Sequence, residues 1–221
     1  MLDPAGRAAL ETVLRLLAVE RASVSSVTEP DRAWRVHVDD SLTGLEVEDL
    51  AGASRIADIG SGAGFPGLPL AVALGGASVD LVESVGRKCD FMRKAAGEAG
   101  IGNVRVLNAR SEELAGAEGR DAYDAVTARA VGRLSTLAEL ASPLLADDGV
   151  LVAWKGRRDA AEEAEMERAA EPLAMRPEQV LAVGPYAGSR HRHLHVLRKS
   201  GPSPADLPRR PGIAKKRPRG S

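Results

Sequence analysis

A glycine-rich stretch between an apolar strand and an apolar helix constrains this chain more than any other feature. The strand ends with Asp58 and Ile59, and Gly60, Gly62, Gly64 and Gly67 follow before the helix. Glycine lets a backbone turn tightly and lets a ligand come close to it. The start of the helix offers free N–H groups and the positive end of its dipole. Strand, glycine turn and helix in this order predict a site for a nucleotide-like ligand in an open α/β sheet.

Two ligands fit such a turn. The run from Gly62 to Gly67 matches the G-x-G-x-x-G pattern of dinucleotide-binding proteins. The run Asp58-x-Gly60-x-Gly62-x-Gly64 also resembles motif I of the class I S-adenosylmethionine (SAM) methyltransferases. A carboxylate at Asp58 would repel the pyrophosphate of NAD but would suit the ammonium and sulfonium of SAM. The alternative is that Asp58 only caps the turn. Charge favours SAM as the ligand.

Composition sets broad limits. The chain has 221 residues, of which 44% are hydrophobic and 28% are charged, as expected for one sizeable domain with extra segments. Its single cysteine, Cys89, excludes an intrachain disulfide and a multi-cysteine metal site. No apolar run reaches the roughly 20 residues of a membrane span, and the N-terminus lacks a signal pattern. We therefore expect a cytoplasmic protein without a membrane segment.

The order of apolar segments predicts a doubly wound α/β sheet. Two helices, at 7–21 and 30–42, precede the first strand, and Thr28 is a candidate N-cap for the second helix. Strands are then expected at 55–59, 78–83, 104–108, 122–129 and 150–155, with helices at 66–74, 87–99, 135–146 and 158–171. Strands near 179–183 and 194–199 would form an antiparallel pair. A seven-stranded, mostly parallel sheet with a terminal hairpin is the Rossmann-like class I methyltransferase arrangement, whereas a plain dehydrogenase sheet lacks the hairpin.

The chain divides into three parts on this interpretation. Residues 1–50 form an N-terminal helical cap and residues 51–200 form the core. Residues 201–221 contain six basic residues, one acidic residue and several prolines. This composition predicts a disordered arm that contacts a polyanion.

Three strand ends carry candidate site residues. Glu83 ends a strand 25 residues after Asp58 and is placed to accept hydrogen bonds from a ribose, which SAM and NAD share. Ser111 and Glu112 follow the next strand, where this fold meets adenine, although Ser111 could equally cap a helix. Arg129 ends the fourth strand, where active-site residues gather.

The region around Arg129 lacks an Asn-Pro-Pro-Tyr type motif and a cysteine nucleophile. Methylation of a ring nitrogen with a free lone pair, such as guanine N7, needs neither, because no proton leaves before the attack. It needs in-line positioning and exclusion of water. A site at Arg129 without an obvious base fits this reaction.

Several further motifs stand at matching spacings along residues 8–199. They are His37-Val-Asp-Asp-Ser-Leu42, the glycine run through Ala71, Glu83-Ser-Val-Gly-Arg87-Lys88, Arg110-Ser-Glu-Glu113, Ala128-Arg-Ala130 and Lys155-Gly156. Together they resemble the ribosomal RNA small subunit methyltransferase G family, also named glucose-inhibited division protein B. This resemblance implies SAM-dependent N7 methylation of one guanine in 16S rRNA, with S-adenosylhomocysteine as the second product.

The resemblance also implies roles for single residues. Arg129 would be catalytic and lie at the methyl-donor pocket, and His37, Asp40 and Ser41 would form its N-terminal wall. The expected SAM-binding residues are Asp58, Gly60, Gly62, Gly64, Phe65, Glu83, Ser111, Glu112 and Arg129. The expected RNA-binding residues are His37, Arg87, Lys88, Arg110, Lys155 and Arg192, although Arg87 and Lys88 could instead be a solvated helix face. The partner would be 16S rRNA or a precursor of the small subunit, bound by a monomer.

Other interpretations remain open at this point. His191, His193 and His195 alternate, but no acid or cysteine stands near them, so we expect no metal site. The enzyme could be a SAM methyltransferase that acts on another RNA or a small molecule. An NAD-dependent oxidoreductase and a non-catalytic RNA-binding module are the remaining classes.

Overall fold

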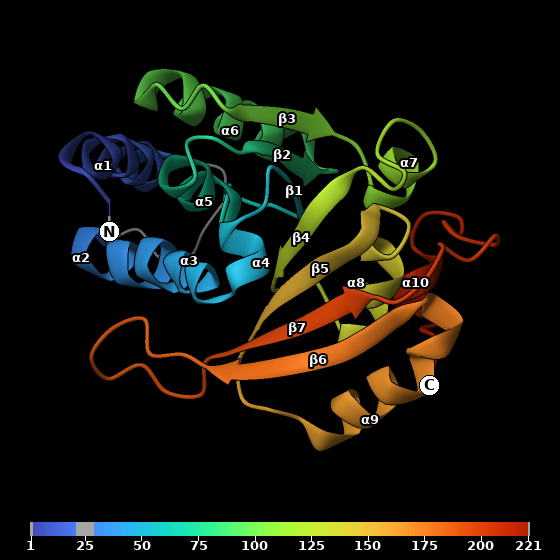
Figure 1. Ribbon diagram of the computed structural model, residues 1–221. Helices are drawn as coiled ribbons and strands as arrows, with labels where there is room; N and C mark the ends of the chain where they lie inside the picture. The colour runs from blue at the N-terminus through green and yellow to red at the C-terminus, as the bar shows by residue number, and fades with distance from the viewer. Residues whose placement is uncertain (1, 21–28, 221) are drawn as a thin grey trace.

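The computed structural model describes residues 2–20 and 29–220. Within these residues, seven strands form one sheet in the order β3-β2-β1-β4-β5-β7-β6 (Figure 1). The strands are β1 (Arg55–Ile59), β2 (Ser78–Glu83), β3 (Val104–Asn108), β4 (Tyr123–Arg129), β5 (Leu145–Lys155), β6 (Met175–Ala182) and β7 (His193–Lys199). Neighbours among β1 to β5 pair in parallel, and β7 runs antiparallel to both β5 and β6. The predicted sheet with its terminal hairpin is confirmed.

The helices alternate with the strands as expected. They are α1 (Pro4–Val19), α2 (Pro30–Ala33), α3 (Asp40–Leu42), α4 (Glu48–Ala51), α5 (Gly67–Ala73), α6 (Gly86–Ala99), α7 (Ser111–Ala115), α8 (Leu134–Ala141), α9 (Ala160–Ala169) and α10 (Ile213–Lys216). A π-helical segment, Trp34–Asp39, joins α2 to α3, so the predicted helix at 30–42 is continuous but not purely α-helical. The candidate cap Thr28 lies outside the described residues.

Apolar side chains build a core on each face of the sheet. In β1, Ile56 belongs to the core beneath α1, α5 and α6, whereas Ala57 and Ile59 belong to the core beneath α8 and α9. All three side chains are fully buried. A parallel strand covered on both faces reads as a continuous apolar run, which is why β1 is so clear in the sequence.

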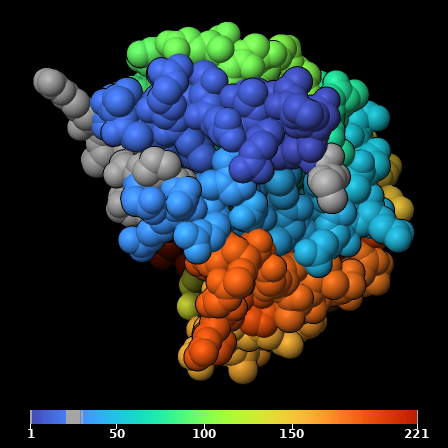
Figure 2. Space-filling view, turned by 90° about the vertical axis from the view of Figure 1, so that its left-hand side faces the viewer, coloured from blue at the N-terminus to red at the C-terminus, as the bar shows by residue number. Residues whose placement is uncertain are grey.

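The N-terminal helices cover one end of the first core. Asp3 caps α1 by accepting a hydrogen bond from the Gly6 amide at 2.7 Å, and Leu10 and Leu17 of this helix are buried. Figure 2 shows α1 in dark blue beside the lighter blue segment that contains α2 and α3, above the orange loop between β6 and β7. No helix in the described part of the chain is long and apolar enough to cross a membrane.

Helix α8 ends earlier than predicted. It stops at Ala141 rather than residue 146, and β5 begins at Leu145. Pro143 is the reason, because its ring cannot continue an α-helix.

The chain after Lys199 also differs from the expected disordered tail. It packs beside α7 and α8 and contains the short helix α10 (Figure 1). Leu207 and Ala214 are each only 3% exposed. These buried apolar side chains attach the segment to the core. The basic, proline-rich composition of the segment does not predict this packing.

Candidate functional site

The buried carboxylate of Asp58 links the glycine turn to β4 and to the start of α5. Its Oδ1 accepts a hydrogen bond from Thr127 Oγ1 at 2.9 Å, and its Oδ2 accepts one from the Gly67 amide at 3.1 Å. The side chain is fully buried, and this burial raises its pKa from 3.8 to about 6. Asp58 therefore fixes the shape of the loop and does not line the pocket that the loop forms. The geometry supports the capping alternative and not the expected direct contact with SAM.

Two glycines of the turn are required by their surroundings. Gly60 has φ of +66°, and a Cβ there would lie 2.7 Å from Cγ2 of Val131. At Gly67 a Cβ would lie 2.2 Å from Cδ2 of Leu81. A larger residue would strain the first position and clash at the second.

A cavity of about 220 Å³, here called the β1–β2 cavity, opens at the carboxyl ends of these strands. It brings together Gly60, Glu83, Ser111 and Glu112, as the sequence predicted. Arg110 lines it as well, so this predicted RNA-binding residue lies at the wall of the β1–β2 cavity. Ser111 is the first residue of α7 rather than its N-cap, which is Arg110.

Glu83 links two loops of this cavity. Its Oε2 accepts a hydrogen bond from the Gly62 amide at 3.1 Å, and its Oε1 accepts one from the Val85 amide at 2.9 Å. Ser84 Oγ also donates to Oε1, at a long 3.5 Å. Oε2 keeps a further lone pair, and a ribose hydroxyl could replace the long Ser84 contact at Oε1. Lys88 Nζ lies 3.8 Å from Oε2, whereas Arg87 is exposed on α6 and lines neither this cavity nor the second one described below.

Arg129 extends from the end of β4 towards the N-terminal helices. Its Nη1 donates to Asp40 Oδ2 at 3.0 Å and to the Val36 carbonyl at 3.2 Å. The guanidinium carbon lies 5.7 Å from the centre of the Phe65 ring, which stacks on the ring of His37 at 4.6 Å. The π-helical segment thus supplies a carbonyl and an aromatic ring to the wall that the sequence expected here.

A second cavity, of about 210 Å³, lies beside Arg129 and is called here the β4–β5 cavity. Arg129, Lys155 and Arg192 all line it. Nε of Arg192 is buried, has no hydrogen-bond partner among the described residues, and lies 3.8 Å from Asp40 Oδ1. Trp154 lines the same cavity and donates from Nε1 to the Asp40 carbonyl at 2.8 Å. Three cationic residues that the sequence assigned to the site therefore line the β4–β5 cavity.

The segment after β4 separates the two cavities. Ala130 and Gly132 line the β4–β5 cavity, whereas Val131 lines the β1–β2 cavity. A bound ligand in one cavity would thus lie close to a molecule in the other.

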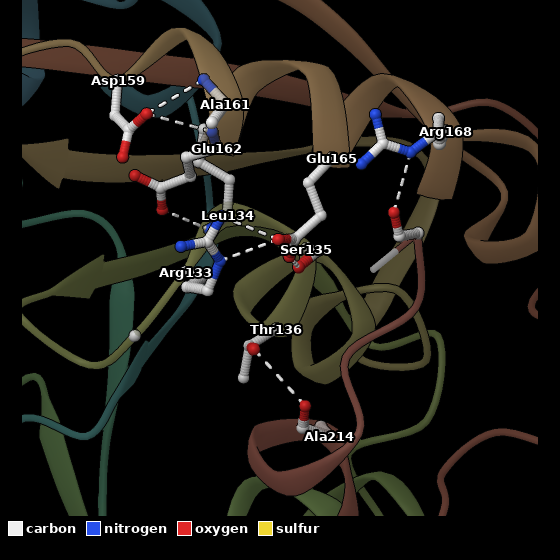
Figure 3. A network of polar contacts seen from close by, with 12 residues as sticks. Arg133, Leu134, Ser135, Thr136, Asp159, Ala161, Glu162, Glu165, Arg168 and Ala214 are labelled. Carbon is white, nitrogen blue, oxygen red and sulfur yellow. Dashed lines mark hydrogen bonds and ion pairs between the residues drawn. The ribbon is translucent and has the colours of Figure 1, made fainter.

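Two buried glutamates fix this segment (Figure 3). Glu162 accepts from the Leu134 amide at 2.7 Å and from Lys155 Nζ at 2.6 Å. Glu165 accepts from Arg133 Nε at 2.8 Å and from the Ser135 hydroxyl. The sequence predicted only an exposed charged helix here, since the spacing of the two acids does not reveal which element they face.

The candidate histidines do not form a metal site with other side chains. Among residues 2–20 and 29–220, no three His, Cys, Asp or Glu side chains come together in a way that could hold a metal ion. His193 Nδ1 lies 2.8 Å from the Gly156 carbonyl, and His195 is buried in β7.

Two solved structures with similar folds are methyltransferases. A mitomycin 7-O-methyltransferase matches 89% of this chain and 69% of its own length, with a TM-score of 0.61 and 15% identity. A SAM-dependent O-methyltransferase from Thermotoga maritima matches 87% of this chain and 72% of its own length, with a TM-score of 0.59 and 16% identity. At these identities the likeness shows a shared class I fold.

Sequence comparison gives the family. Residues 10–194 match the family model described as rRNA small subunit methyltransferase G. A protein of that name from Rubrobacter xylanophilus is 42% identical over 94% of this chain and 81% of its own length. A Deinococcus radiodurans protein of the same name is 39% identical over 94% of this chain and 85% of its own length. The chain therefore belongs to the ribosomal RNA small subunit methyltransferase G family.

Proposed function

We propose that this protein transfers a methyl group from SAM to N7 of one guanine in 16S rRNA. The observation that carries the proposal is the pair of adjoining cavities on either side of the segment after Arg129. One is lined by the acid and glycine pattern that suits a nucleoside, and the other is lined by three cationic side chains. The proposal includes a cytoplasmic monomer that acts on naked 16S rRNA or on a precursor of the small subunit.

The β1–β2 cavity fits the nucleoside part of SAM. Glu83 has lone pairs available for ribose hydroxyls, and Ser111 and Glu112 border the place where adenine would lie. Gly60 lines the same cavity. Bound here, SAM supplies an electrophilic methyl group: a nitrogen lone pair forms the new C–N bond while the C–S bond breaks, and S-adenosylhomocysteine leaves.

The residues around Arg129 position the reactants and exclude water. Arg129 is held by Asp40 and by the Val36 carbonyl, so its guanidinium has a fixed orientation. Phe65 and His37 form a stacked aromatic pair beside it. Guanine N7 carries a free lone pair, so no side chain has to remove a proton. Orientation of the two reactants is then the main contribution of the protein.

The β4–β5 cavity suits an RNA segment. Lys155 at its wall is paired with Glu162, whereas Nε of Arg192 has no hydrogen-bond partner among the described residues. A phosphate contact from Arg192 would contribute affinity that falls with salt. This contact would hold the nucleotide without requiring that the protein read many base edges. The same charges disfavour a small neutral substrate.

Nucleoside analysis tests the proposal. The protein is incubated with methyl-labelled SAM and unmodified 16S rRNA, and the RNA is digested to nucleosides. Label that elutes only with 7-methylguanosine supports the proposal. Label in another nucleoside, or binding of SAM without transfer to RNA, would reject the assigned substrate atom or substrate.

A further inference from the structure

The C-terminal segment 207–216, here called the C-terminal strap, lies on α7 and α8. Its first residue, Leu207, is 3% exposed, and the Leu207 carbonyl accepts a hydrogen bond from Arg120 at 3.0 Å. The strap follows the residues that match the family model, which end at 194.

An ion pair anchors the strap to the core. Arg209 Nε and Nη2 each lie 2.5 Å from an oxygen of Glu139. The two hydrogen bonds form the bidentate pair that is strong between a guanidinium and a carboxylate. Glu139 is on α8 and is only 3% exposed. Arg209 Nη2 also donates to the carbonyl of Arg217, the residue after the strap, at 2.7 Å.

The strap reaches the β1–β2 cavity. The Gly212 amide donates to Glu112 Oε1 at 2.8 Å. The Ala214 carbonyl accepts a hydrogen bond from Thr136 Oγ1 at 3.4 Å (Figure 3). Gly212, Ala214 and Lys215 line the cavity together with Glu83 and Ser111. The strap thus joins α7 and α8 across one side of the cavity.

We propose that the C-terminal strap is a wall of the cofactor pocket, and that it contacts the adenosine part of bound SAM and slows its release. This proposal rests on the function proposed above, because it deepens the description of the same SAM site. With the strap in place the cavity still has a volume of about 220 Å³, so the strap borders the pocket rather than filling it.

Two of the six basic side chains after residue 200 form ion pairs within the protein, and a third lines the cavity. Arg209 is paired with Glu139, Arg219 is paired with Asp206, and Lys215 lines the cavity. Arg209 and Arg219 are thus held at the protein's own surface, whereas Arg210, Lys216 and Arg217 are exposed. A ligand enclosed by an additional wall leaves more slowly, and most affinity differences of this kind appear in the dissociation rate.

Two matched pairs of variants in the full-length protein test the proposal. Arg209→Ala removes the anchor, and Arg210→Ala removes the same charge from an exposed neighbour. Gly212→Ala places a side chain at φ of +81°, where the strain disturbs the contact with Glu112, whereas Gly201→Ala adds the same methyl group at a residue without positive φ. The two glycine variants keep the Arg209 ion pair. They therefore still test the effect of the strap on SAM release if Arg209→Ala fails to fold.

The measurement is the release rate of labelled SAM after dilution into unlabelled SAM, together with the affinity for an rRNA fragment. We expect release about tenfold faster for Arg209→Ala and about threefold faster for Gly212→Ala, with both controls like wild type and RNA affinity unchanged. Unchanged release in both test variants, or tighter SAM binding, would overturn the proposal. So would an equal loss of RNA affinity in Arg209→Ala and Arg210→Ala with unchanged SAM release. Failure of wild type to bind SAM would reject the proposed function first, and the strap's role with it.

Discussion

The Arg129 guanidinium donates to the Asp40 carboxylate across 3.0 Å, and this contact joins the end of β4 to the N-terminal helices. Arg192, from the loop before β7, lies 3.8 Å from the other oxygen of the same carboxylate. Asp40 is 5% exposed. One buried acid therefore orients two of the cations that line the β4–β5 cavity.

Asp40→Asn is expected to slow methyl transfer with little effect on SAM binding. The amide keeps the size of the side chain but loses the charge that holds Arg129, and misplacement of a positioning group costs about tenfold to a hundredfold in rate. Single-turnover transfer and calorimetric SAM binding measure the two effects. Asp39→Asn is the control, because Asp39 accepts from Trp34 Nε1 at 2.9 Å instead. Equal rates in both variants would contradict the positioning role.

Glu83→Gln is expected to weaken SAM binding. Glu83 accepts hydrogen bonds from two backbone amides, and an amide side chain would turn a donor towards one of them. Loss of a hydrogen bond to a charged group corresponds to about tenfold or more in affinity. Titration of SAM into the variant measures this loss, and Glu98→Gln on the exposed face of α6 is the control. SAM affinity equal to wild type would exclude Glu83 as the ribose partner.

Arg192→Ala is expected to weaken rRNA binding and to lower its salt dependence. Removal of one phosphate contact reduces the slope of log affinity against log salt by about 1. Filter binding over a series of salt concentrations gives this slope. Arg93→Ala removes a charge that is paired with Asp90 on exposed α6, and this control should keep the wild-type slope. An unchanged slope for Arg192→Ala would place the RNA elsewhere.

Asp58 is expected to make stability depend on pH. Burial raises its pKa from 3.8 to about 6, so the folded state binds more protons than the unfolded state between these values. The contribution of Asp58 to the unfolding free energy should therefore be lowest above pH 6 and should rise as the pH falls through this window. Relative to Asp58→Asn, which cannot titrate, the wild type should gain about 2 kcal/mol between about pH 7.5 and about pH 4.5. Urea unfolding at both pH values measures the difference, and parallel behaviour of the two proteins would contradict it.

The sequence predicts this fold well where strands are buried on both faces. β1 and β2 have the expected bounds, because each is a short buried apolar run closed by turn residues. The edge strand β3 is only partly buried, and its alternating valines still predict its bounds. β5 was expected to begin at residue 150, but it begins at Leu145, which pairs with Tyr123 across an irregular register. The polar run from Asp147 to Gly149 predicts a turn and not a strand. The strand nevertheless includes these residues, because pairing with β4 outweighs their local propensity.

The candidate site was predictable only in part. The sequence locates Glu83 and Arg129 because both end strands, and the fold brings these ends together. It does not show which way a side chain points. Asp58 accepts hydrogen bonds from Thr127 and Gly67, and Arg209 of the C-terminal strap donates to Glu139. Such partners are distant in sequence and leave no local pattern.

Chemical mapping of the methylated base tests the central claim most directly. Small subunits and 16S rRNA that lack the modification are incubated with the protein and SAM, and the RNA is then cleaved at 7-methylguanine by reduction and aniline treatment. The account predicts one new cleavage site, dependent on SAM and lost in Asp40→Asn at short reaction times. Methylation at another atom, or no transfer by a protein that binds SAM, would contradict it.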